Sequence, residues 1–167
     1  MSDEAYMARA LRLAALGRGW TNPNPMVGAI IVSGTHVLAE GYHHRYGDLH
    51  AERDALKSAM RKGLDVRGAT MYVTLEPCCH FGRQPPCTDA IIEAGITRVV
   101  IGSSDPNPKV AGQGIGILRE AGIEVSEGVL ADECLALNEA FITYIQTGRP
   151  LVTMKYAMII RDRKSVV

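Results

Sequence analysis

The segment TMYVTLEPCCHFGRQPPCTDAIIEAG, residues 70–95, carries the pattern that decides the fold. Thr70 to Leu75 is a short run rich in apolar and β-branched residues, which is typical of a buried strand. Thr88 to Ala94 is a short helical pattern that Gly95 can end, and Arg98 to Ile101 follows as a second buried strand. This alternation of strand and helix indicates an α/β fold.

The same alternation extends outward from this segment in both directions. Before it, Met26–Val32 and His36–Tyr42 flank the turn signal Ser33-Gly34 and predict a hairpin. Further helices are expected at residues 2–16, 51–62, 114–121 and 132–146, and a further strand at residues 123–126. A hairpin followed by alternating helices and strands predicts a three-layer α/β/α sandwich with a mixed sheet of about five strands.

Length, charge and cysteine usage exclude several classes of protein. The chain of 167 residues is long enough for roughly one domain, and its 18 basic and 18 acidic residues give no electrostatic reason to bind nucleic acid. No apolar run reaches the roughly 18 residues of a membrane span, and the start MSDEAYMARA does not read as a secretory signal. Four cysteines without a leader are more typical of metal ligands or free thiols than of disulfides. We therefore expect one soluble cytoplasmic domain.

The strongest chemical signal combines His50 with Cys78 and Cys87. Histidine and cysteine are the side chains that Zn²⁺ prefers, and three protein ligands leave the fourth tetrahedral position to water, as in catalytic zinc sites. A bound zinc ion lowers the pKa of water to about 7, which makes hydroxide available at neutral pH. The cysteines flank a loop that leads into the predicted helix at Thr88, whose N-terminus favours thiolates.

Glu52 follows His50 by two positions in the sequence His50-Ala51-Glu52. In the middle of a helix this spacing would point the two side chains apart. If His50 stands at the helix entrance, both side chains can face one cavity, and Glu52 is then the expected proton shuttle. A structural zinc site with Cys79 or His80 as its fourth ligand is the alternative, and Glu52 favours the catalytic site.

These motifs resemble a known family. An H-x-E motif followed by P-C and a later cysteine resembles the zinc-dependent cytidine-deaminase-like superfamily. Base deaminases usually carry P-C-x-x-C, whereas Cys78 and Cys87 here lie nine positions apart. That longer loop, preceded by T-L-E-P-C and containing G-R-x-P-P-C, resembles the deaminase domain of the bifunctional riboflavin-biosynthesis deaminase/reductases. Further matching blocks are TNPNPMVGAIIV (21–32), GYHHRYGDLHAE (41–52) and DPNPKVAGQGI (105–115).

The resemblance implies a fold, a metal and a reaction. The fold is that of the cytidine deaminases, with zinc as the sole metal, His50, Cys78 and Cys87 as its ligands, and Glu52 as the catalytic proton shuttle. The implied reaction is hydrolytic deamination of 2,5-diamino-6-(5-phosphoribosylamino)pyrimidin-4(3H)-one to 5-amino-6-(5-phosphoribosylamino)uracil and ammonia. The implied division of the chain is a deaminase domain at residues 1–149, with residues 150–167 as the start or remnant of a missing C-terminal reductase domain. Reductase activity is therefore not expected.

Six residues are expected to contact the phosphorylated pyrimidine: the resemblance implies the first two, and position in the chain indicates the other four. These are Asn24, His43, His80, Arg83, Asp105 and Asn107. Asn24 stands between two prolines, which hold its amide rigidly enough to read a ring edge. Arg83 lies between the two metal cysteines and can make bidentate contact with a phosphate. Asp105 follows the fourth predicted strand at its carboxyl end, where open α/β sheets usually bind ligands.

Two other functions stay open at this point. One is a deaminase of nucleic-acid bases, for which a P-C-x-x-C spacing and a basic surface would be expected. The other is a catalytically inactive module that zinc stabilises, against which Glu52 argues. We expect a small-molecule substrate, with no nucleic acid and no membrane as partner. Monomer, homodimer and higher homo-oligomer all stay open. The apolar run Leu151–Ile160 predicts an edge strand or the start of a second domain, and its exposure would favour self-association.

Overall fold

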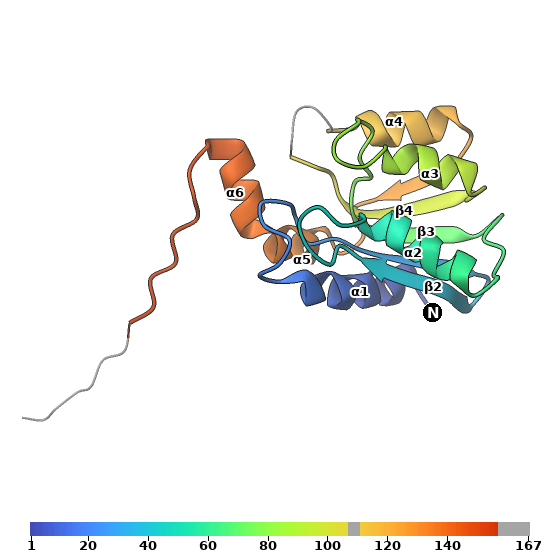
Figure 1. Cartoon of the computed structure of the whole chain (residues 1–167), viewed down its shortest axis with the longest axis horizontal. Coiled ribbons are helices and arrows are strands. Elements are labelled where there is room, and N and C mark those ends of the chain that lie inside the picture. The colour runs from blue at the N-terminus through green and yellow to red at the C-terminus, as the bar shows by residue number, and fades with distance from the viewer. Residues whose placement is uncertain (107–110, 157–167) are drawn as a thin grey trace, which may run out of the picture.

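A mixed five-stranded sheet forms the centre of the computed structural model, which describes residues 1–106 and 111–156 (Figure 1). Its strands are β1 (Gly28–Ser33), β2 (His36–Tyr42), β3 (Thr70–Leu75), β4 (Arg98–Ser103) and β5 (Glu124–Glu127), in the order β2-β1-β3-β4-β5. Strand β1 pairs antiparallel with both β2 and β3, whereas β3, β4 and β5 are parallel. The predicted hairpin and mixed sheet are both confirmed.

Helices cover both faces of this sheet (Figure 1). The bounds are α1 (Asp3–Ala14), α2 (Ala51–Arg61), α3 (Cys87–Glu93), α4 (Gln113–Glu120), α5 (Ala131–Leu137) and α6 (Glu139–Thr147), with a 3₁₀ turn at Ala15–Gly17. Along β1, Ala29 and Ile31 join the core under α2, α3 and α4, whereas Ile30 and Val32 join the core under α1 and α5. Side chains of a strand alternate between its faces, so one apolar strand supplies both cores of the predicted sandwich.

Two glycines let helices approach the sheet closely. A Cβ atom on Gly28 would overlap the backbone of Ala10 in α1, and one on Gly41 would overlap the backbone of Ala55 in α2. Ser2 caps α1 as predicted, since its side-chain oxygen accepts the N–H of Ala5 at 3.4 Å. The close packing at Gly41 fixes α2, and with it the functional residues at the N-terminus of that helix.

The C-terminal part of the chain departs from the prediction in two ways. The single helix expected at residues 132–146 is two helices, α5 and α6, which meet at the buried Asn138. Its side-chain amide bonds the backbone N and O of Met26 at 2.8 and 2.9 Å, and this long-range contact holds the break.

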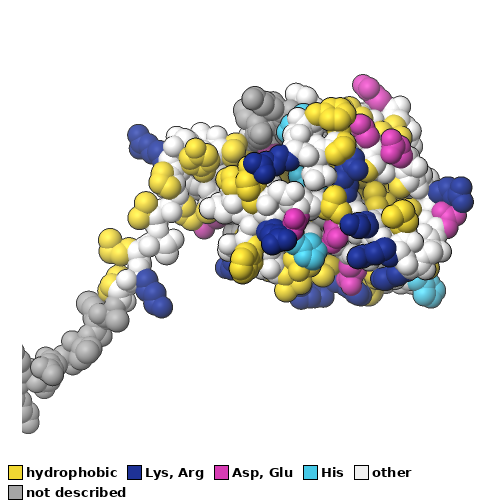
Figure 2. Space-filling model, in the orientation of Figure 1, with side chains coloured by type: hydrophobic (Ala, Val, Ile, Leu, Met, Phe, Trp, Pro, Cys, Tyr) yellow, Lys and Arg dark blue, Asp and Glu magenta, His cyan; other side chains and the backbone are white. Residues whose placement is uncertain are grey.

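The apolar run after Pro150 was expected to be an edge strand or the start of a second domain. Residues 151–156 form neither helix nor strand, and within the described sheet no strand pairs with them, so the strand prediction is wrong there. Val152 and Met154 are each 81% exposed, and Figure 2 shows hydrophobic side chains standing out along this extended segment. The rest of the predicted run, residues 157–160, lies outside the described residues. Among the described helices, none is long and apolar enough to cross a membrane.

Candidate active site

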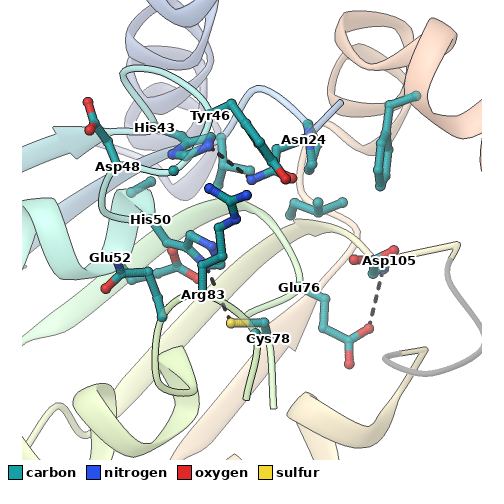
Figure 3. Close-up of a pocket in the computed structure, with 18 of the residues that line it drawn as sticks. Asn24, His43, Tyr46, Asp48, His50, Glu52, Glu76, Cys78, Arg83 and Asp105 are labelled. Carbon is teal, nitrogen blue, oxygen red and sulfur yellow. Dashed lines mark hydrogen bonds between the residues drawn. The ribbon is translucent and has the colours of Figure 1, made fainter. Parts of the chain in front are cut away.

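Three side chains that can bind a metal converge where α2 and α3 begin. Figure 3 shows two of them, His50 and Cys78, at the pocket. His50 is the N-cap of α2, Cys87 is the first residue of α3, and Cys78 lies in the loop after β3. His50 therefore stands at the entrance of the helix, which is the position that lets His50 and Glu52 face one cavity. Its Nδ1 atom lies 3.4 Å from the sulfur of Cys78 and 3.4 Å from that of Cys87.

The distances and charges of this cluster fit a zinc ion. A tetrahedral zinc with bonds of about 2.0 Å to nitrogen and 2.3 Å to sulfur separates these atoms by about 3.5 Å. The hydrogen bond from Cys87 lowers the pKa of the Cys78 thiol, while the contact with Cys78 and burial raise the pKa of Cys87. Without a metal, only one of the two sulfurs ionises readily. A divalent cation bound between them would allow both to become thiolates.

Among the described residues, only these three side chains form a cluster that could hold a metal. Cys79, a candidate fourth ligand, places its sulfur 3.9 Å from Oε1 of Gln113 instead. His80 is exposed and lines the pocket beside the cluster. The geometry therefore favours a site with an open position over a closed structural site.

Glu52 is buried in the first turn of α2, beside the cluster. Burial raises its pKa to about 7, and the nearby Cys78 thiolate acts in the same direction. A carboxyl group with a pKa close to neutrality can both accept and release a proton at pH 7. Glu52 and the three zinc-type ligands thus supply the parts that the sequence associated with hydrolysis.

A cavity of about 280 Å³ opens in front of this cluster. Asn24, His43, His80, Arg83 and Asp105 all line it, so the structure brings together five of the six residues proposed to contact substrate. The sixth, Asn107, lies outside the described residues.

His43 is buried, and both of its ring nitrogens already have protein partners. Nδ1 lies 2.9 Å from the carbonyl oxygen of Leu49, which can only accept, so Nδ1 carries the proton. Burial lowers the pKa of His43, so the ring is neutral at pH 7, and Nε2 accepts from the amide nitrogen of Asn24 at 3.2 Å. His43 therefore orients Asn24 at the pocket wall.

The structure adds a pocket residue that sequence reasoning missed, the buried Glu76. Its carboxylate accepts backbone N–H groups from Asp105 (3.3 Å), Gly112 (3.0 Å), Gly114 (3.1 Å) and Ile115 (3.4 Å). Figure 3 shows the contact with Asp105. The sequence did carry a signal for this role. Glu76 is an acidic residue at the end of a buried strand, directly before Pro77-Cys78, and a buried carboxylate needs several hydrogen-bond donors.

Comparisons with known proteins agree with this geometry. Residues 1–103 match the family described as the cytidine and deoxycytidylate deaminase zinc-binding region. The chain belongs to this family of zinc-binding deaminases.

Within the deaminase family, the chain is 60% identical over 158 residues to the riboflavin biosynthesis protein RibD of Actinobacillus pleuropneumoniae, covering 95% of this chain but 41% of that protein. It is 48% identical over 150 residues to the diaminohydroxyphosphoribosylamino-pyrimidine deaminase of Buchnera aphidicola, covering 90% of this chain and 100% of that protein. The crystal structure of the bifunctional deaminase/reductase of Thermotoga maritima superposes with a TM-score of 0.86 at 55% identity, covering 89% of this chain and 42% of the other. The chain thus spans less than half of its bifunctional relatives.

Proposed function

We propose that this deaminase hydrolyses 2,5-diamino-6-(5-phosphoribosylamino)pyrimidin-4(3H)-one to 5-amino-6-(5-phosphoribosylamino)uracil and ammonia, a step of riboflavin biosynthesis. The observation that carries the proposal is the match to the Buchnera aphidicola deaminase over that protein's whole length. The buried Glu52 beside His50, Cys78 and Cys87 supports it, because this set contains the parts that hydrolytic deamination needs.

His50, Cys78 and Cys87 would hold the zinc, which supplies hydroxide at neutral pH when bound. In the proposed reaction the oxygen of water becomes the new carbonyl oxygen. Glu52 transfers one proton of the water to the ring nitrogen next to the reacting carbon, and the second proton to the departing amine, which leaves as ammonia. Asn24, oriented by His43, would read the edge of the pyrimidine, and the guanidinium of Arg83 would meet the phosphate.

Ammonia release from the diaminopyrimidine phosphate tests this proposal directly. We expect the zinc-loaded protein to turn over and the Glu52→Gln variant to lose about 10²–10⁴-fold in kcat with its zinc content unchanged, because an amide cannot carry the proton. Glu93→Gln, which changes an exposed acid on α3, is the matched control and should keep full activity. A parent protein that binds one zinc ion per chain and releases no ammonia would contradict the proposal and indicate an inactive module.

We propose that residues 1–149 are the deaminase domain and that residues 150–167 are the start or remnant of a reductase domain. The end of α6 at Thr147 and the exposed apolar side chains after Pro150 support this division. The proposed setting is the cytoplasm, where Cys78 and Cys87 stay reduced and can bind zinc. Self-association through the segment after Pro150 stays a prediction.

A further inference from the structure

The guanidinium of an arginine lies over an aromatic ring at the pocket wall. Arg83, in the loop between Cys78 and Cys87, places its guanidinium carbon 4.6 Å from the ring centroid of Tyr46, in the loop between β2 and α2. Figure 3 shows the two side chains together at the cavity, which both of them line. This is cation–π geometry, in which the ring face attracts the charge.

Tyr46 is anchored by the protein more firmly than Arg83. The backbone N of Tyr46 donates to the carbonyl oxygen of Trp20 at 2.9 Å, so the base of the ring is anchored to a neighbouring loop. The Arg83 side chain is exposed and flexible by nature, and it crosses to Tyr46 and the adjacent Gly47, where a Cβ atom would lie 3.6 Å from its Nη1. Tyr46 thus gives the guanidinium a defined place at the cavity.

The charge of Arg83 has no carboxylate partner within the described part of the chain. Two nearby arginines are engaged differently: Arg45 pairs with Asp48 at 2.9 Å, and Arg53 donates to the carbonyl oxygens of Pro85 and Pro86. A cation–π contact uses the positive charge of the guanidinium and forms no hydrogen bond with its N–H groups, which leaves them available for oxygen acceptors. A phosphate monoester presents such acceptors.

We propose that Tyr46 is a positioning residue for the phosphate of the substrate, which acts by holding the Arg83 guanidinium so that its N–H groups meet the phosphate oxygens. The inference rests on the proposed function, which supplies a phosphate monoester as part of the substrate. Holding Arg83 before binding reduces the side-chain freedom that is lost when the phosphate arrives.

Steady-state kinetics with the phosphorylated substrate and its dephosphorylated analogue test the role of Tyr46. Tyr46→Leu should raise KM for the phosphorylated substrate about two- to fivefold, the effect of an exposed cation–π contact, and leave kcat unchanged. The KM for the dephosphorylated analogue should not change. Tyr46→Phe, which keeps the ring and removes only the hydroxyl, should behave like the parent protein.

Two further variants separate positioning from a general structural effect. In an Arg83→Gln background, Tyr46→Leu should have no additional effect on KM, because the ring would have no charge to hold. Trp20→Leu alters an aromatic side chain that is 69% exposed and does not line the cavity, so it should leave both KM values unchanged. Equal increases in KM for both substrates, or a full effect of Tyr46→Leu in the Arg83→Gln background, would overturn the inference.

Binding of ribose 5-phosphate tests the role of Tyr46 without depending on the proposed reaction. If the parent protein releases no ammonia, the proposed function fails, and calorimetric titration with ribose 5-phosphate still reports on the phosphate contact. A two- to fivefold weaker Kd for Tyr46→Leu than for the parent supports the positioning role. Equal Kd values for the two proteins, or no binding to either, would overturn it.

Discussion

Asp3 shows at the scale of one residue how a surface acid can join three elements. Its carboxylate, in the first turn of α1, accepts hydrogen bonds from the Tyr72 hydroxyl of β3 at 2.8 Å and from two nitrogens of Arg98 of β4 at 3.2 and 2.7 Å. The hydrogen bond from Arg98 lowers the pKa of Asp3, while that from Tyr72 acts in the same direction. The negative charge also lies at the positive end of the helix dipole.

We predict that Asp3→Asn lowers the free energy of unfolding by about 1 kcal/mol at pH 7, because Asp3 and Arg98 keep 33% and 27% of their side chains exposed and water weakens the pair. Since the folded pKa lies below the unfolded value of 3.8, the contribution is present above that value and is lost as the pH falls through the folded pKa. Thermal unfolding of parent and variant from pH 7 down to about pH 2 checks this.

The matched control is Asp65→Asn, which breaks an ion pair with Arg67 whose side chains are 62% and 79% exposed. This variant should unfold close to the parent protein at every pH. A stability difference between Asp3→Asn and the parent that stays constant down to the lowest pH would contradict the electrostatic explanation.

Glu76 acts at the scale of secondary-structure elements. Its carboxylate, directly after β3, accepts N–H groups from Asp105, which follows β4, and from Gly114 and Ile115 in the first turn of α4. A single side chain thus joins the ends of two parallel strands to the beginning of a helix. Because Cys78 follows Glu76 by two residues, the same contacts brace the loop that carries one metal-binding cysteine against the pocket wall at Asp105.

We predict that Glu76→Gln destabilises the fold by about 2 kcal/mol, because the amide nitrogen cannot accept the hydrogen bonds that a carboxylate oxygen accepts. For a chain of this size the melting temperature should fall by roughly 4–8 °C. The KM for the phosphorylated pyrimidine should also rise, since Asp105 loses its support. Thermal melting and steady-state kinetics measure the two effects, with Glu93→Gln as the surface control. A variant with unchanged stability and KM would show that the contacts at Glu76 are dispensable.

At the scale of the whole molecule, the three zinc-type ligands come from different parts of the fold. His50 caps α2, Cys78 follows β3 and Cys87 begins α3, so a single ion would join two helices to one end of the sheet. Arg53 of α2 reinforces this junction through hydrogen bonds to the carbonyl oxygens of Pro85 and Pro86, just before Cys87. Ligands that lie far apart in the sequence come together only in the folded chain, so metal binding favours folding.

We predict that removal of zinc by a chelator lowers the melting temperature and that added Zn²⁺ restores it. At a free zinc concentration of about 100 times Kd, the ion adds about 2.7 kcal/mol, or roughly 5–10 °C for a chain of this size. Differential scanning fluorimetry, with zinc content measured by elemental analysis, gives both quantities. A Cys87→Ser variant should show little response to the chelator, whereas Cys134→Ser, which alters a buried cysteine outside the cluster, should respond like the parent. Equal melting temperatures for zinc-loaded and zinc-free parent protein would contradict the prediction.

Local patterns determined much of this protein. The strands from Gly28 to Tyr42 and from Thr70 to Leu75 follow from runs of β-branched and apolar residues bounded by turn signals, and the helix beginning after His50 follows from its periodicity. The metal-binding residues were also recognisable, because histidine and cysteine at element ends are specific to few chemistries. The resemblance to zinc deaminases rested on these residues together with Glu52, and the narrower resemblance to the riboflavin-biosynthesis deaminases rested on the longer cysteine loop and on further sequence blocks.

The tertiary structure alone decided the features that depend on residues far apart in the chain. The break at Asn138 depends on Met26, the role of His43 depends on Asn24, and the place of Arg83 depends on Tyr46. Patterns of hydropathy and turn residues indicate which side of a segment is buried and where the segment ends. They do not indicate which distant residue a given side chain will contact. Hydrogen bonds and stacking are directional and short-ranged, so only the folded arrangement of loops determines which side chains they join.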